Sequence, residues 1–196
     1  MIRYTRKLDT PIGRLEVIAS ARGIEEVRFG GTRGGEAAGD HPLLAQAERE
    51  LAEYFEGRRQ TFALPIALSG TAFEQEVYRE LLAVPFGETR SYSGLAARLG
   101  RPRAARAVGS ANARNPLALL VPCHRVIGAD GSLTGYAGGE DAKRWLLLHE
   151  RRLAGRPRGL PTAAAGRAPP EPPGNTPDFG GESHGPTKPK ALRFQG

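Results

Sequence analysis

Short apolar segments separated by glycine begin the chain. Residues 14–19 partly alternate between apolar and polar side chains, and a second such segment, residues 24–29, follows Gly23. This pattern predicts short strands joined as hairpins. Five glycines in residues 30–40 then predict a loop, after which apolar residues recur at helical spacing as far as Phe55.

Residues 60–68 carry enough apolar side chains for one more strand. The hydrophobic fraction of 39% over 196 residues is sufficient to bury a core. No motif with recognisable chemistry occurs in this first half, so we interpret it as a structural α/β domain.

The middle of the chain has helical patterns. Thr71 and Glu74 have the spacing of a capping box, which predicts that a helix begins there. Residues 91–99 form a second helical pattern that Gly100 closes, and Pro102 lies near the first turn of a third. Two short helices joined by a tight, glycine-containing corner indicate a helix-turn-helix.

The third helix would be thin and basic. The residues that share its polar face at helical spacing are Arg103, Arg106, Ser110 and Arg114. Ala104, Ala105 and their small neighbours would let the backbone approach a phosphate or a narrow groove closely. The periodicity fits an ordinary solvated Ala/Arg helix equally well.

Charge distribution favours the first of these interpretations. The net charge is +7, and residues 87–114 alone hold six Arg and one acidic residue. A basic excess confined to one segment is typical of a polyanion-binding surface, although a solvated face remains the alternative.

An apolar run at residues 115–121 predicts a buried strand that stops at Pro122, and the only cysteine, Cys123, follows it. A lone cysteine is either core filler or a nucleophile. A nucleophilic thiol needs a base, and His124 is adjacent, although neighbours in an extended chain point to opposite sides. Glu150 and Asp141 are the downstream carboxylates that could orient the imidazole.

The remaining segments are a turn at residues 128–131, a glycine-rich loop at 135–139 and a helix at 140–151. Beyond residue 153 the composition changes, because nine of the sixteen prolines lie there. We therefore expect residues 154–196 to be a disordered tail.

Four motifs in order resemble the O6-alkylguanine-DNA alkyltransferases, also called methylated-DNA–protein-cysteine methyltransferases. They are Arg101–Gly109 (RPRAARAVG), Asn115-Pro116, Pro122–Val126 (PCHRV) and Gly135–Gly139 (GYAGG). The resemblance implies an α/β protein: an RNase H-like domain at residues 1–68, and a mainly helical, winged-helix-like domain with the helix-turn-helix at residues 69–153. It implies DNA repair by direct reversal, in which Cys123 irreversibly accepts the alkyl group of O6-alkylguanine, or of O4-alkylthymine, once per molecule.

The same resemblance implies the roles of the site residues. His124 would deprotonate Cys123 through a water, Glu150 would hold the imidazole, Asn115 would structure the turn and Tyr92 would donate to guanine N3. Arg106 would fill the gap left by a flipped base. The other pocket and DNA-contacting residues would be Pro122, Val126, Tyr136, Ala137, Arg103, Ala104, Ala105 and Ser110.

The implied partner is double-stranded DNA containing O6-alkylguanine, bound through its minor groove by a monomer. No cofactor, metal or membrane is implied: one Cys and four scattered His form no zinc-ligand pattern, and no apolar stretch is long enough for a signal peptide or a membrane span. With one thiol, we expect a cytoplasmic protein. The alternatives are a non-catalytic lesion-binding relative, a cysteine hydrolase and a helix-turn-helix regulator.

Overall fold

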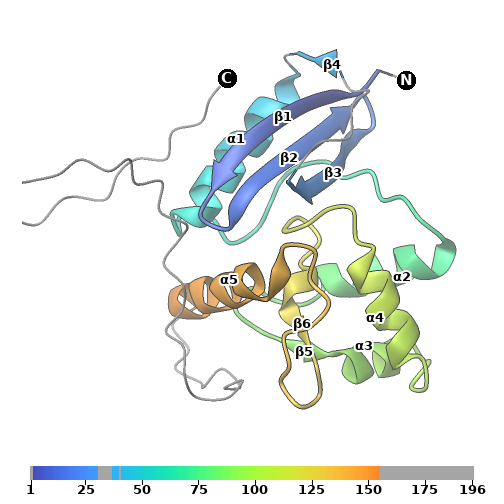
Figure 1. Cartoon of the computed structure of the whole chain (residues 1–196). Helices are drawn as coiled ribbons and strands as arrows, with labels where there is room; N and C mark the ends of the chain where they lie inside the picture. The colour runs from blue at the N-terminus through green and yellow to red at the C-terminus, as the bar shows by residue number, and fades with distance from the viewer. Residues whose placement is uncertain (1, 31–36, 40, 155–196) are drawn as a thin grey trace, which may run out of the picture.

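The N-terminal part is a sheet covered on one face by a helix (Figure 1). A computed structural model describes residues 2–30, 37–39 and 41–154 of the chain. The sheet has the order β3-β2-β1-β4, with β4 parallel to β1 and the other pairs antiparallel. The elements of this part are β1 (Tyr4–Thr10), β2 (Gly13–Ser20), β3 (Gly23–Phe29), β4 (Ala37–Ala38) and α1 (Pro42–Phe55).

The predicted hairpins and the predicted helix are confirmed. Alternate residues of β2, such as Leu15 and Val17, are fully buried and share one core with Leu44 and Leu51 of α1. Gly23, the first residue of β3, lies against the segment at residues 60–68. Its φ is +132°, and an added Cβ would lie 2.6 Å from the Pro65 carbonyl oxygen, so glycine is favoured at this position. Of the glycine-rich loop, residues 31–36 and 40 lie outside the described residues.

The strand expected at residues 60–68 is not formed. That segment makes only an isolated bridge between Ile66 and Ile24 of β3. Ile24 donates its N–H to the Pro65 carbonyl, and Ala67 donates to the Ile24 carbonyl. Because Pro65 has no N–H of its own, it cannot extend a ladder, and the segment crosses the end of the sheet as an irregular link.

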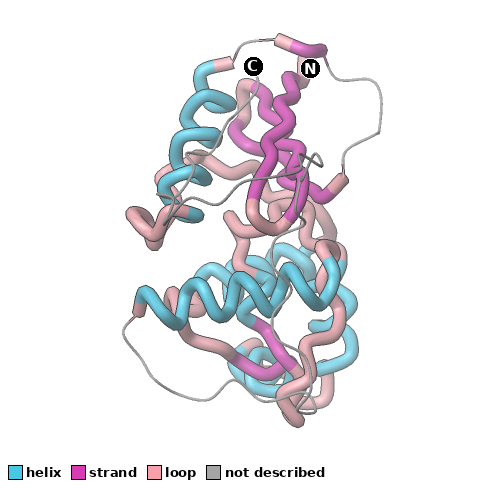
Figure 2. The backbone as a smooth tube through the Cα atoms, turned by 60° about the vertical axis from the view of Figure 1, so that its left-hand side comes forward, coloured by secondary structure: helices cyan, strands magenta, loops and turns pink. Residues whose placement is uncertain are grey.

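The C-terminal part is mainly helical and lies below the sheet in Figure 2. Its elements are α2 (Ala72–Leu82), β5 (Arg90–Ser91), α3 (Tyr92–Arg98), α4 (Ala105–Ala113), a 3-10 turn (Cys123–Arg125), β6 (Val126–Ile127) and α5 (Gly139–Leu153). The capping box at Thr71 and Glu74 is present, and α3 and α4 form the expected helix-turn-helix. However, α4 begins at Ala105, so Pro102 and Arg103 lie in the preceding turn.

The prediction of a buried strand at residues 115–121 is wrong. Residues 117–121 are buried but irregular, and Leu119 has a φ of +67°. The segment touches the sheet at one point, where Val27 of β3 donates to the Pro116 carbonyl and accepts from the Ala118 N–H. A backbone that turns this sharply cannot continue a ladder.

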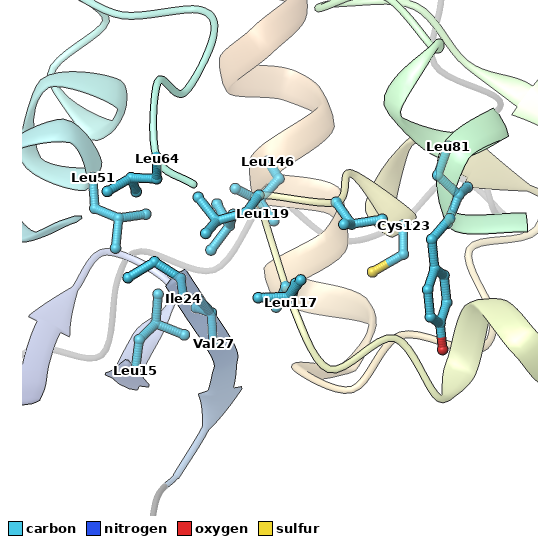
Figure 3. Packing of buried hydrophobic residues seen from close by; sticks show 14 of the residues in the cluster. Leu15, Ile24, Val27, Leu51, Leu64, Leu81, Leu117, Leu119, Cys123 and Leu146 are labelled. Carbon is cyan, nitrogen blue, oxygen red and sulfur yellow. The ribbon is translucent and has the colours of Figure 1, made fainter. Parts of the chain in front are cut away.

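One apolar core joins the two parts. Figure 3 shows Leu117 and Leu119 between the sheet residues Ile24 and Val27 on one side and Cys123 on the other. The segment that leads to the only thiol is therefore fixed by packing from both parts of the chain. Within the ranges that the structure describes, no helix is both long and apolar enough to cross a membrane.

Candidate active site

Cys123 begins the 3-10 turn that follows Pro122. The turn removes the difficulty of adjacent side chains pointing to opposite sides, because Cys123 and His124 are no longer in extended backbone. Its backbone is tied down: Cys123 donates its N–H to Val121 at 2.7 Å, and its carbonyl accepts from the Val126 N–H and from Asn112 Nδ2. Pro122 and Val126 are both buried beside it.

Asn115 fixes the chain just before the turn. Its Nδ2 donates to the Val121 carbonyl at 2.8 Å, and its Oδ1 accepts from the Leu117 N–H at 3.0 Å.

Burial raises the pKa of the Cys123 thiol, and Asn115 and Lys143 only partly offset this. The thiol is therefore protonated near neutral pH and needs a base before it can act as a nucleophile.

Glu150, on α5, is the carboxylate that meets His124. His124 Nε2 lies 2.9 Å from Glu150 Oε1, and both side chains are almost completely buried. Asp141, the other candidate, is exposed in the first turn of α5. The structure thus decides between the two carboxylates that the residues alone left open.

Five hydrogen bonds converge on the Glu150 carboxylate. Oε1 accepts from His124 Nε2, Tyr54 Oη and Arg125 Nη2, and Oε2 accepts from Arg125 Nε and the Gly87 N–H. Burial raises the pKa of Glu150, but His124 and Arg125 lower it by more, so the group is ionised. A buried carboxylate with this many donors is held in one position.

His124 is set up to accept a proton on its other nitrogen. Because a carboxylate only accepts hydrogen bonds, Nε2 carries the ring hydrogen and Nδ1 has a free lone pair. Nδ1 is buried and has no hydrogen-bond partner among the described residues. Burial lowers the pKa of His124 and Glu150 raises it in part, so the imidazole is neutral near pH 7.

The glycine-rich loop lies over this pair. The Tyr136 ring packs edge-on against Phe29 of β3 and against His124, with centroid separations of 5.5 and 6.3 Å. Gly138 is needed for this packing, because an added Cβ would lie 2.4 Å from the Phe29 ring. Ala137 is exposed beside them. The N-terminal sheet therefore supports one wall of the site.

Tyr92, the first residue of α3, lies at the edge of the same region. Its hydroxyl donates to the Thr134 carbonyl at 3.1 Å, which also accepts from Lys143 Nζ at 2.9 Å. Burial lowers the pKa of Lys143 to about 8 and raises the pKa of Tyr92. Tyr92 thus remains a phenol that can donate a hydrogen bond at neutral pH.

Arginines around α4 divide into two groups. Four of them pair with carboxylates: Arg90 with Glu88, Arg98 with Glu80, Arg101 with Glu76 and Arg114 with Glu74. Within the described ranges, Arg103 and Arg106 have no such partner, and both are exposed. The stripe expected on the third helix is therefore shorter than its periodicity suggested, because Arg114 faces α2.

A hollow at the surface is lined by Arg103, Ala104, Ala105, Arg106, Ala107 and Ser110. The residues expected to contact DNA from α4 and the turn before it thus share one surface. None of these lining residues belongs to the buried Cys123–His124–Glu150 cluster.

Three residues in the site were missed by sequence reasoning. Arg125 pairs with Glu150, and its Nη1 also donates to the Val84 carbonyl at 2.6 Å. Lys143 Nζ donates to the Thr134 carbonyl, and the Tyr54 hydroxyl, which comes from α1, donates to Glu150 Oε1. Tyr54 falls on the apolar stripe of its helix, so its spacing indicates only a core residue. A charged Arg125 inside a buried motif was the one signal that could have been used.

Comparisons with known proteins show which family the two parts of the chain match. Residues 3–68 match the family model of the 6-O-methylguanine DNA methyltransferase ribonuclease-like domain, and residues 72–152 match that of its DNA binding domain. A methylated-DNA–protein-cysteine methyltransferase of Methanosarcina barkeri is 43% identical over 156 residues, which cover 76% of this chain and 99% of that protein. A constitutive one of Bacillus subtilis is 50% identical over 113 residues, covering 58% and 68% of the two chains.

Solved structures show the same likeness. The crystal structure of Mycobacterium tuberculosis OGT in complex with DNA has a TM-score of 0.72 and 43% sequence identity, covering 76% of this chain and 94% of that one. A Pyrococcus kodakaraensis O6-methylguanine-DNA methyltransferase, at 22% identity and a TM-score of 0.57, shares the fold.

Proposed function

The chain belongs to the methylated-DNA–protein-cysteine methyltransferases, and from that premise we propose how its own residues carry out the transfer. The protein repairs DNA by direct reversal, moving an alkyl group irreversibly from the damaged base to Cys123. Each molecule therefore acts once. The residue roles below and the identity of the lesion as O6-alkylguanine are our proposal.

The first step activates the thiol. A water between Cys123 and His124 Nδ1 passes the thiol proton to the imidazole, which Glu150 holds through Nε2. This role is supported by the free Nδ1 lone pair and by the buried, protonated state of the thiol. Without a base, only a small fraction of such a thiol would be thiolate near pH 7.

The second step is a single displacement. Cys123 Sγ attacks the alkyl carbon, so that the S–C bond forms as the C–O6 bond breaks and its electron pair passes to the guanine. Guanine is a poor leaving group as an anion, and Tyr92 stabilises it by donating a hydrogen bond to N3. Tyr92 would exchange its resting acceptor, the Thr134 carbonyl, for N3. The guanine then takes up a proton, and the Cys123 thioether is the second product.

The base reaches Cys123 by leaving the duplex. We propose that α4 enters the minor groove, where its small residues permit close approach, while Arg106 fills the gap in the stack and Arg103 contacts phosphate. These two arginines are available because no carboxylate among the described residues holds them. Asn115, Pro122, Tyr136, Ala137 and Val126 would line the pocket for the extruded base.

The active species is proposed to be a monomer in the cytoplasm, where a reducing environment keeps Cys123 free to react. It would have its domain boundaries at residues 68 and 153. The competing functions fit the residues less well. A lesion-binding relative needs no buried thiol with a base, and a cysteine hydrolase would have to release product and turn over.

The test is the mass of the peptide that carries Cys123 after incubation with duplex DNA containing O6-methylguanine. We expect one added methyl group on Cys123 and no more than one per protein. DNA binding without modification would favour the lesion-binding function, and sustained hydrolysis of a peptide or ester would favour the hydrolase.

A further inference from the structure

Tyr54 is a residue of the N-terminal part that lies inside the acceptor site. It comes from the last turn of α1, 96 positions before Glu150 in the sequence, and its hydroxyl donates to Glu150 Oε1 at 2.7 Å. Its exposed fraction is 1%. The chain therefore completes the environment of Glu150 only when its N-terminal part is packed in place.

Two independent contacts hold Tyr54 against α5. His149 Nε2 donates to the Tyr54 carbonyl at 2.8 Å, so the backbone of Tyr54 is fixed as well as its side chain. The ring is surrounded by the rings of Phe55, Phe62, Phe86 and His149 at centroid separations of 5.4 to 6.1 Å. The hydroxyl thus has a defined position, and the packing of the ring does not depend on it.

The hydroxyl acts on the oxygen that matters for the base. Oε1 accepts from His124 Nε2 at 2.9 Å and also from Arg125 Nη2, whereas Oε2 accepts only from Arg125 Nε and the Gly87 N–H. Each donor on Oε1 stabilises part of the same negative charge. Tyr54 and His124 therefore compete for one oxygen, and the strength of one hydrogen bond affects the other.

We propose that Tyr54 is a positioning residue for alkyl transfer, which fixes Glu150 Oε1 against His124 and limits how strongly that carboxylate polarises the imidazole. This inference rests on the proposed roles of His124 and Glu150. It makes the N-terminal part a contributor to the chemistry as well as to the fold. Tyr54 acts through Glu150 and does not touch the reacting atoms.

The measurement is the single-turnover rate of Cys123 methylation as a function of pH. His124 must be neutral to take the thiol proton, so the rate falls as the pH drops through the pKa of His124. Tyr54→Phe removes one donor from Oε1, which leaves more negative charge facing His124 and raises its pKa. The acid limb should move to higher pH by about half a unit or more, and the plateau should fall severalfold.

A change in the opposite direction separates tuning from packing. A monofluorinated tyrosine at position 54 keeps the ring and the hydroxyl but makes the hydroxyl a stronger donor, so the acid limb should move to lower pH. This variant also retains the buried hydrogen bond should Tyr54→Phe fail to fold. Tyr4→Phe is the matched control, since Tyr4 lies in β1 and its ring packs against His41.

Glu150→Gln separates the role proposed for Tyr54 from the role proposed for Glu150. If Tyr54 acts through the carboxylate, Tyr54→Phe should not shift the limb in the Glu150→Gln background. A lower melting temperature with an unchanged pH profile, or shifts of one sign for both Tyr54 variants, would overturn the inference. An unmethylated wild-type Cys123 would instead overturn the proposed function, and a wild-type profile for Glu150→Gln would overturn the role of Glu150.

Discussion

Two regions of this molecule carry charge in opposite ways. Around Glu150, the side chains that contact the carboxylate are buried and hydrogen-bonded: Arg125 contacts both carboxylate oxygens, and His124 and Tyr54 share one of them. On the surface formed by α4 and the turn before it, Arg103 and Arg106 are exposed and contact no carboxylate among the described residues. The first region is organised before any substrate arrives, whereas the second is left unsatisfied for a partner to complete.

The difference shows how the two tasks are divided. Charge inside a protein is costly to bury unless it is fully paired, so the site that activates the thiol is rigid and supported from both parts of the chain. Exposed arginines cost little to leave unpaired and can release counterions from DNA. Substitutions should therefore affect chemistry and stability in the first region, and DNA recognition in the second.

The largest expected effect separates chemistry from binding. Cys123→Ser replaces the thiol by a hydroxyl, which is a much weaker nucleophile, so methyl transfer should be abolished. Affinity for duplex DNA should stay within about twofold, because the groups of α4 are untouched. Peptide mass and a gel-shift titration measure the two. Residual transfer at another residue would show that Cys123 is not the acceptor.

Removing the carboxylate should cost stability as well as rate. Glu150→Ala leaves Arg125 buried without its charge partner, and breaking a buried pair in this way costs about 3–5 kcal/mol. The unfolding free energy from urea denaturation measures this loss. Asp141→Ala, on the same helix but exposed, is the matched control and should have little effect. Equal effects of the two substitutions would contradict the contrast between the regions.

Acid should weaken the buried region in a defined range of pH. The pKa of Glu150 is lowered from its ordinary 4.5 in the folded protein, because His124 and Arg125 outweigh the effect of burial. Stability from this group is therefore fully present above the unfolded pKa and is lost as the pH falls below it. Urea denaturation from about pH 5 down to about pH 2, the range in which this group loses its contribution, should show a steeper decline in the wild type than in Glu150→Gln. An equal decline in both proteins would assign the acid sensitivity elsewhere.

A smaller effect is expected from the exposed region. Arg106→Ala should slow repair of duplex DNA by about tenfold, because the cost of leaving a gap in the base stack is no longer offset. Reaction with the free base O6-methylguanine, which needs no flipping, should be unchanged. Arg101→Ala is the matched control, since Arg101 is already held by Glu76. Equal loss with both substrates would contradict the role of Arg106.

Features that depend on residues close together in the sequence could be predicted. Features that depend on contacts between distant segments could not. The capping box at Thr71 depends on residues three apart, and it specified α2 correctly. Residues 60–68 and 115–121 were wrongly expected to be strands, because each contacts β3 through only two backbone hydrogen bonds, which no local pattern reveals. Apolar runs indicate burial, and here burial occurs without a ladder.

The site residues also fall into those that the sequence reveals and those that only the fold brings together. Cys123 and His124 lie in one motif and are evident from it, and the resemblance to a family supplied Glu150. Tyr54 and Arg125 were not found, because their roles depend on which side chains the fold brings to one carboxylate. A tyrosine on the apolar stripe of a helix has the same spacing whether its hydroxyl is idle or bonded.

Arg114 should show the smallest effect, and it tests where the DNA-binding surface ends. Helical spacing places Arg114 with Arg106, but its Nε donates to Glu74 Oε1, on α2. Glu74 keeps its capping bonds to Thr71 without Arg114, so the helix start survives the substitution. Arg114→Ala should therefore change duplex repair by less than about twofold, as expected for an exposed ion pair. A loss as large as that of Arg106→Ala, in the same single-turnover assay, would show that the DNA-binding surface extends to the end of α4. Arg114 would then have to leave Glu74 when DNA binds.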